Sequence, residues 1–245
     1  MSTKHGVDFK GHEEKVKELF LKVDNNKSLN KGTYGTVKKK GMKRSLIGKT
    51  KKEWNVDAVC LQETKLSEDI TEVVRDIWGN KWVDYVHLEA SGTRGGIVIM
   101  WDKRDWEGKL SSVGMYSVSC SLVGKTQDFK WHLTCIYAPN HRQEREKTWG
   151  EIGATRGLFS GPCILCGDFN TTRHPLEKKN CRRINNAMSD LSEFIEDMEL
   201  VNLDLKGGKY TWKKGDRHDN ATRLDRILIS DEMDDSFKYL KHYVL

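Results

Sequence analysis

The chain has 245 residues, a formal net charge of +6 and three prolines. This length accommodates one large α/β domain as readily as two small ones, and the lack of a Ser/Pro-rich linker argues against a string of modules. No apolar run reaches the ~18 residues of a membrane span and no signal-peptide core opens the chain, so we expect an intracellular protein with no membrane partner, and a nuclear location is compatible with this.

The N-terminal part of the chain is strongly basic, because Lys and Arg outnumber Asp and Glu in residues 1–53. Apolar residues at helical spacing predict a short amphipathic helix over 13–23. Residues 24–41 are rich in Asn, Gly and Lys, which is typical of a loop or of disorder. We therefore divide the chain into a basic, partly disordered extension (1–41) and a domain (42–245). The extension either binds phosphates or is a solvated tail.

Strand-like segments outnumber helical segments in the rest of the chain. The predicted strands cover 56–61, 82–88, 96–101, 115–123, 130–139, 163–169, 209–212 and 223–230. The predicted helices cover about 43–53, 68–78, 141–157 and 187–198. Long alternating strands in excess of helices favour layered sheets that are covered by helices.

The six cysteines lie in apolar segments, which in an intracellular chain indicates buried thiols and no disulfide-linked partner. Cys163 and Cys166 form a CxxC pattern. Positions three apart on a strand face opposite sides, so these two cannot chelate one metal together. Trp101, Trp106 and Trp131 are predicted to be core aromatics rather than platforms for bases.

Polar or acidic residues follow directly on several apolar strands. They are Glu63 in “CLQETKL”, Tyr137 and Asn140 in “IYAPN”, and Asp168 and Asn170 in “CGDFN”, while Asp225 lies inside “RLDRILIS”. Asp168 and Asn170 are two positions apart and point to one side of an extended strand end, although a single Asp-x-Asn is commonly an ordinary Asx turn. Oxygen ligands gathered at strand ends suit a hard divalent cation such as Mg²⁺.

These four segments, in this order, resemble the endonuclease/exonuclease/phosphatase superfamily. The finer resemblance is to the apurinic-like endonuclease domains of long interspersed (non-LTR) retrotransposons. The segments “EASGTRGGIVIMW” and “GGKYTW” also resemble these domains. It runs from about residue 42 to the C-terminus. The resemblance implies an α/β fold, a two-layered β-sandwich flanked by helices (DNase I-like), with the active site at one edge. It also implies Mg²⁺- or Mn²⁺-dependent cleavage of phosphodiester bonds, with DNA as the partner.

The resemblance also implies roles for individual residues. Glu63 matches the metal-binding glutamate, Asp168 the aspartate that activates or positions the attacking water, and Asn170 the asparagine beside it. Tyr137 matches the tyrosine near the scissile phosphate, and Asp225 the aspartate that orients a catalytic histidine. Candidates for contact with nucleic acid are Asn140, Arg223 and Trp212.

Two elements of the family pattern are not found in the sequence. The family's first strand carries a Trp-Asn pair, but Asn55 precedes Glu63 by eight positions, fewer than the ~10–12 that a crossover needs. The Ser-Asp-His motif expected after “RLDRILIS” is also missing, and His218 and His242 are weak substitutes. We therefore expect a sandwich truncated at both ends, incomplete at its first and last strands, and a weakened active site.

Three functions remain open at this point. The first is a metal-dependent DNA endonuclease of retroelement origin with reduced activity. The second is a catalytically inactive remnant that folds or binds nucleic acid without cleaving it. The third, less favoured by the retrotransposon-like segments, is a phosphatase that acts on small phosphorylated substrates.

Overall fold

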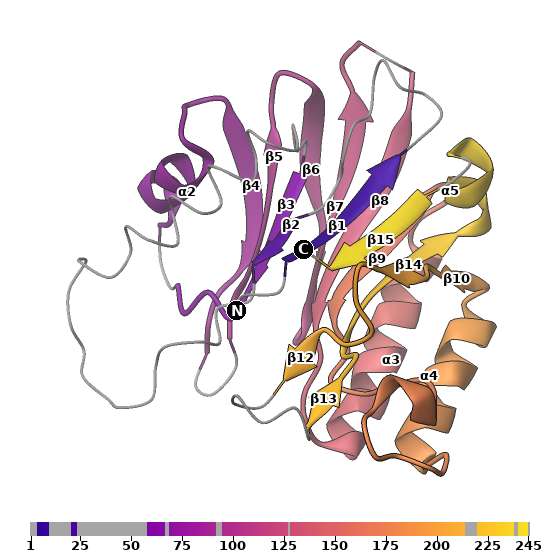
Figure 1. The fold of residues 1–245 in the computed structure, drawn as a ribbon. Coiled ribbons are helices and arrows are strands. Elements are labelled where there is room, and N and C mark those ends of the chain that lie inside the picture. Colours follow the sequence, from indigo (N-terminus) through magenta and orange to yellow (C-terminus); the bar gives the residue numbers. More distant parts are fainter. Residues whose placement is uncertain are drawn as a thin grey trace, which may run out of the picture.

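The computed structural model describes residues 4–9, 21–23, 58–66, 69–91, 95–126, 128–213, 220–237 and 240–244. Two β-sheets pack face to face, and helices cover their outer faces (Figure 1). The predicted helix over 43–53, the Trp54–Asn55 pair and His218 lie outside the described residues.

The first sheet has seven strands in the order β11-β15-β1-β2-β3-β5-β4. These are β1 (Lys4–Phe9), β2 (Leu21–Val23), β3 (Ala58–Gln62), β4 (Val83–Leu88), β5 (Ile97–Asp102), β11 (Leu205–Lys206) and β15 (Leu240–Val244). β3 and β5 are buried along their whole length, which explains their nearly continuous apolar sequences. Residues 21–23, predicted as the end of a helix, instead form β2, because they pair in parallel with β3.

The second sheet has six strands in the order β10-β14-β9-β8-β7-β6. These are β6 (Trp106–Val113), β7 (Ser117–Gly124), β8 (Lys130–Tyr137), β9 (Cys163–Asp168), β10 (Leu200–Asn202) and β14 (Asp225–Ser230). β8 and β9 run in parallel, and the helix α3 (Arg142–Gly157) connects them. A two-stranded ribbon of β12 (Trp212–Lys213) and β13 (Ala221–Thr222) precedes β14.

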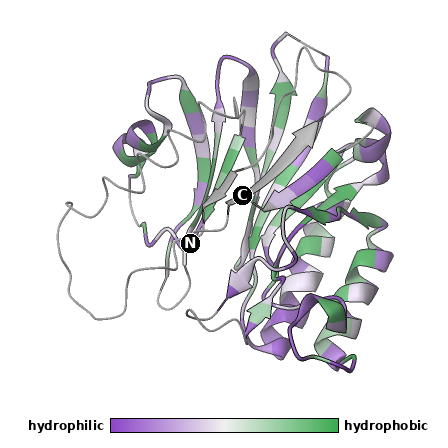
Figure 2. Cartoon of the chain, in the orientation of Figure 1, coloured by the Kyte–Doolittle hydropathy of each residue, from purple (hydrophilic) through white to green (hydrophobic). Residues whose placement is uncertain are grey.

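Three apolar clusters hold these layers together. The largest lies between the two sheets and contains Trp101, Trp106 and Trp131, each at most 2% exposed, which confirms their prediction as core residues. A second cluster packs α2 (Thr71–Trp78) onto the outer face of the first sheet. A third packs α3 and α4 (Asn186–Asp197) onto the second sheet, and α4 carries hydrophobic and hydrophilic residues on different sides (Figure 2).

The predicted strands of the domain are confirmed with small shifts of their ends, except that the one predicted over 209–212 shares only Trp212 with the short strand β12. We expected Asp225 to interrupt a strand, but it is the first residue of β14. The sequence prediction missed β1, β6, β10, β11, β13, β15, the 3₁₀ turn η1 (Pro175–Glu177) and the short helix α5 (Asp231–Ser236). All six cysteines are described and are thiols, and Cys163 and Cys166 face different clusters, as predicted. Five of the six are buried, whereas Cys181, which we expected in a buried apolar segment, is only half-buried and lies outside the strands. Within the described part of the chain, no helix is long and apolar enough to cross a membrane.

Candidate active site

Three of the predicted site residues lie in one row across the second sheet. Tyr137 at the end of β8 is opposite Asp168 at the end of β9, and Asp168 is opposite Asp225 at the start of β14. Residues in register on neighbouring strands project to the same face, about 5 Å apart. The row therefore brings a phenol and two carboxylates together at one edge of the sandwich. Two carboxylates in register repel each other, and a cation beside them offsets that cost.

The turn after β9 fixes the position of Asp168. Its Oδ1 accepts a hydrogen bond of 2.8 Å from the backbone N–H of Asn170, which lies in the left-handed region with φ 48°. The side-chain amide of Asn170 donates to the carbonyl of Ala138, and the N–H of Ala138 donates to the carbonyl of Asp168 over 2.8 Å. The Asp-x-Asn segment thus does form an Asx-type turn, and this turn connects the ends of β8 and β9.

Gly167 allows the two strand ends to come this close. Its φ is 140°, and a Cβ atom there would lie 2.0 Å from the carbonyl oxygen of Ile136 and 2.3 Å from Nε2 of Gln62. That same Nε2 donates to the carbonyl of Ile136. Gln62 therefore reaches from the first sheet to β8 through the space that glycine leaves free.

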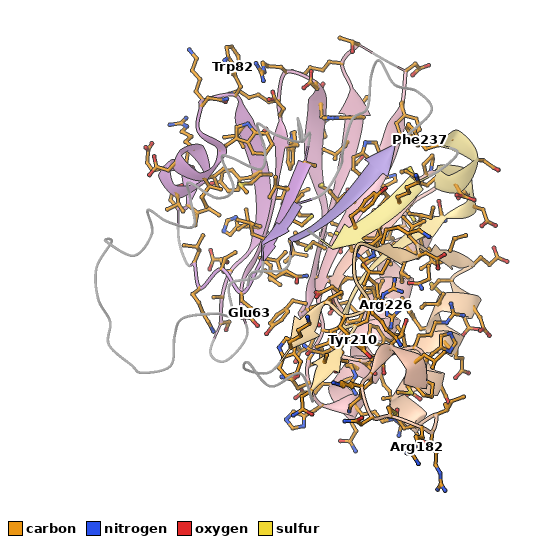
Figure 3. All side chains as sticks on the ribbon, viewed as in Figure 1. Glu63, Trp82, Arg182, Tyr210, Arg226 and Phe237 are labelled. Carbon is orange, nitrogen blue, oxygen red and sulfur yellow. The ribbon has the colours of Figure 1, made fainter. Side chains whose placement is uncertain are left out.

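Glu63 comes from the other sheet, directly after β3, and its carboxylate accepts a hydrogen bond from the hydroxyl of Tyr137. It adopts a left-handed conformation with φ 53°. The backbone at Gly95 runs against it, since a Cβ on Gly95 would be 2.7 Å from the Cα of Glu63. Figure 3 shows Glu63 at the end of the strands of the first sheet. The resemblance predicted both residues, and the fold brings them into contact.

Asp225 is 3% exposed, and its backbone is held by Thr211. The Thr211 hydroxyl oxygen accepts the N–H groups of Leu224 over 2.9 Å and of Asp225 over 3.0 Å. Thr211 is itself buried in the “KYTW” segment that precedes β12. This segment therefore supports the site through a hydroxyl group.

A buried ion-pair network lies beneath the loop that follows the Asx turn. Glu177 accepts a hydrogen bond of 2.9 Å from Arg226 Nη1, and its second oxygen accepts another from Arg226 Nη2. The backbone N–H of Arg173 donates to the same carboxylate over 2.6 Å. Burial acts to raise the pKa of Glu177, but the hydrogen bonds and charge of Arg226 outweigh it and lower that pKa below its ordinary value.

Arg223 belongs to the same network and is 8% exposed. Its Nη2 donates to the carbonyl of Leu203 over 2.7 Å, and its Nη1 lies 3.6 Å from Glu177. Burial, together with the nearby charge of Arg226, lowers the pKa of Arg223 to about 10. A guanidinium directed into the protein in this way does not favour the nucleic-acid contact that we predicted for it.

The remaining predicted residues lie around the row. Asn140 is exposed, and its carbonyl and that of Pro139 accept hydrogen bonds from the buried Arg145 of α3. Trp212 is half-buried on β12, in register with Thr222. His242 is fully buried on β15. A histidine that replaces the missing catalytic one would have to reach the substrate at the surface, and the buried His242 does not.

The carboxylates of the site suit a hard divalent cation that takes only one or two of its ligands from the protein. Within the described residues, the carboxylates do not form a cluster with three ligand atoms mutually within 4.8 Å. Mg²⁺ is commonly held by one or two carboxylates and completed by water and substrate phosphate. Glu63, half-buried at the edge of the sandwich and facing the phenol of Tyr137, suits such a site.

Sequence reasoning assigned no role to Gln62, Thr211, Glu177 and Arg226, which contact or adjoin the segments that carry the site. The glycine of “CGDFN” was the available signal for a close approach at β9. Nothing in the local sequence distinguishes Glu177 or Arg226 from surface charges.

Comparisons with known proteins agree with this geometry. A model of the endonuclease/exonuclease/phosphatase family matches residues 44–235. An exodeoxyribonuclease of Bacillus subtilis (strain 168) is 24% identical over 215 residues, which are 74% of this chain and 80% of that protein.

Several solved structures have the same fold at low sequence identity. The endonuclease domain of TRAS1, a telomere-specific non-LTR retrotransposon, has a TM-score of 0.58 at 14% identity, over 80% of this chain and 81% of that chain. The AP endonuclease LMAP from Leishmania major has a TM-score of 0.57 at 11% identity, over 78% and 75% of the two chains. The 3′ phosphatase NExo from Neisseria, bound to a product DNA hairpin, has a TM-score of 0.56 at 15% identity, over 77% of this chain and 82% of that chain. These likenesses confirm the predicted two-layered sandwich with flanking helices.

Proposed function

The chain belongs to the endonuclease/exonuclease/phosphatase family, and we propose that it is a metal-dependent phosphodiesterase that cleaves DNA, of the type found in non-LTR retrotransposons. The family is the one that the four sequence motifs predicted. The observation that carries the proposal is the contact of Glu63 with Tyr137 across the two sheets, next to the row formed by Tyr137, Asp168 and Asp225.

Phosphodiester hydrolysis needs a positioned water and donors that stabilise charge on the phosphate oxygens. The proposed role of Asp168, whose Oδ1 is held by the Asx turn, is to orient the water and accept its proton. Tyr137 presents a phenolic hydroxyl at the same edge, on the side of Glu63. Asp225 lies directly opposite Asp168, and its proposed role is to orient a neighbouring catalytic side chain. We assign these three roles to the row.

Glu63 would hold Mg²⁺ or Mn²⁺, which when bound neutralises charge that develops on the phosphate. DNA is the proposed substrate because the characterised relatives named above include a deoxyribonuclease and a phosphatase that was solved with a DNA hairpin. The exposed Asn140 and the half-buried Trp212 are the proposed contacts with the nucleic acid.

The test is nicking of supercoiled plasmid by the purified protein, with Mg²⁺ or with EDTA. We expect nicking in Mg²⁺, none in EDTA, and a loss of at least ~10²-fold in Glu63→Gln and in Asp168→Asn. Glu72→Gln is the matched control, because Glu72 is exposed on α2 and pairs with Arg75 on the surface. Each variant is checked for an unchanged unfolding transition.

The same samples separate the alternatives. Binding of a fluorescent duplex without nicking would favour the inactive remnant. Release of phosphate from 3′-phosphorylated or small substrates without nicking would favour a phosphatase. Equal nicking by wild-type protein and both site variants would assign the activity to a contaminant and would overturn the proposal.

A further inference from the structure

Three cysteines meet in the core between the two sheets. Cys60 comes from β3 in the first sheet, and Cys135 and Cys166 come from neighbouring positions of β8 and β9 in the second. All three Sγ atoms lie within 4.8 Å of one another, and those of Cys60 and Cys166 are 3.6 Å apart. The three residues are at most 5% exposed. The other three cysteines of the chain are not part of this cluster.

We propose that this cluster is a binding site for a soft monovalent metal ion, Cu(I). A point equidistant from three sulfurs at these separations lies at most about 2.6 Å from each, close to the ~2.3 Å of a metal–thiolate bond. Soft thiolate ligands select soft ions, of which Cu(I) is one. The three side chains thus need little rearrangement to coordinate one ion.

The number of ligands also favours Cu(I). Each sulfur that coordinates does so as a thiolate and releases its proton to solvent. The copper stays Cu(I), so no oxidant or reductant takes part. Zn(II) carries two charges and takes four ligands in structural sites, whereas this cluster offers three sulfurs. Gln62 Nε2 lies 3.5 Å from Sγ of Cys135, as a donor to a thiolate would.

The cluster lies directly beneath the candidate active site. Cys135 and Cys166 are in register, and each precedes a residue of the row, Tyr137 and Asp168, by two positions on the same strand face. Cys60 is on β3, and Glu63 directly follows the end of this strand. An ion bound by all three sulfurs would join the two sheets just below the edge where the site residues meet. Occupation of the cluster should therefore stabilise the sandwich.

The experiment is an anaerobic titration with Cu(I) in competition with a chromogenic Cu(I) chelator. We expect one ion per chain, an ultraviolet thiolate-to-Cu(I) absorption band, and an unfolding midpoint raised by several degrees. The titration is made in a Cys181→Ser background, because Cys181 is the one cysteine that is not fully buried. Cys60→Ser and Cys166→Ser should each weaken binding at least ~10-fold and remove the rise in midpoint.

Cys163→Ser is the matched control, because Cys163 is buried on the same strand as Cys166 but faces the opposite cluster. It should bind Cu(I) as the parent does. If Cys60→Ser or Cys166→Ser does not fold, the parent and the control still test the site through stoichiometry and midpoint. Refolding in the presence of Cu(I) tests entry into a closed core. A parent that takes up no Cu(I) by either route, or an equal loss in the Cys163→Ser control, would overturn the proposal.

Discussion

The hydroxyl of Tyr137 donates a hydrogen bond to the carboxylate of Glu63, and this contact joins the end of β8 in one sheet to the end of β3 in the other. A row of residues within one sheet is fixed by strand pairing, but a contact between sheets depends on how the layers pack. The geometry of the proposed site therefore depends on both the register of the second sheet and the packing of the sandwich.

Removal of this hydroxyl should affect chemistry much more than folding. In Tyr137→Phe the carboxylate of Glu63 loses its donor, and the site loses a hydrogen bond directed at its edge. We expect plasmid nicking to fall about 10²–10³-fold, with a change of about 1 kcal/mol or less in the free energy of unfolding. Tyr116→Phe is the control, since Tyr116 also donates to a carboxylate, that of Glu144, but on the exposed surface. Equal loss in both variants would contradict the assignment.

A side chain at Gly167 should disrupt the site by disrupting the fold around it. The Cβ in Gly167→Ala would lie 2.0 Å from a backbone carbonyl oxygen, at a φ of 140° that L-residues rarely adopt. We expect the free energy of unfolding to fall by roughly 3 kcal/mol or more in chemical denaturation. In the control Gly150→Ala, on helix α3 with nothing within 4 Å, stability should rise by about 0.4–1 kcal/mol. A stable Gly167→Ala protein would mean that the two strand ends are farther apart than described.

The ion pair of Glu177 with Arg226 should be a strong determinant of stability. The Arg226 side chain is fully buried, so Glu177→Gln leaves its charge without a counterion. Breaking a buried pair in this way costs about 3–5 kcal/mol. Glu72→Gln, which breaks an exposed pair with Arg75, should change stability by less than about 1 kcal/mol. Urea unfolding of both variants distinguishes the two cases, and equal small effects would refute the buried network.

Acid should weaken the same network in a predictable way. The pKa of Glu177 in the folded protein lies below its ordinary value of 4.5, so its contribution is complete above that value and is lost as the pH falls through the lowered pKa. The stability difference between wild-type protein and Glu177→Gln should therefore be constant near neutral pH and shrink below about pH 4.5. Urea unfolding from pH 7 to pH 3 measures this, and a difference that persists unchanged in acid would exclude Glu177 as its source.

The sequence was informative where chemistry and strand pattern coincide, and less so elsewhere. Glu63, Asp168 and Asn170 could be singled out as candidates because each lies at the end of an apolar segment with the pattern of a buried strand and matches a motif of the family. Their relation to Asp225 could not, because strand register is set by pairing between segments distant in the chain. Arg226 looks like a surface charge within its own strand, and only the folded loop brings Glu177 to it.

Some elements escaped prediction for similar physical reasons. β6 is an edge strand with mixed exposure, so its residues lack a clear alternation between apolar and polar side chains. β15 has a sequence with several polar residues, and its place in the first sheet depends on pairing with β1 at the other end of the chain. Residues 21–23 are part of a helical apolar pattern, but pairing with β3 determines their conformation.

Thr211 should support Asp225 through its hydroxyl group rather than through its bulk. In Thr211→Val the N–H groups of Leu224 and Asp225 lose the oxygen that accepts them, and an unsatisfied buried donor costs about 1–3 kcal/mol. Thr211→Ser keeps the oxygen and is the matched control. We therefore expect Thr211→Val to lower both the free energy of unfolding and the rate of plasmid nicking, because the start of β14 loses its anchor, whereas Thr211→Ser should retain most of both. If serine is as damaging as valine, the methyl group matters more than the hydroxyl, and Asp225 is positioned by packing alone.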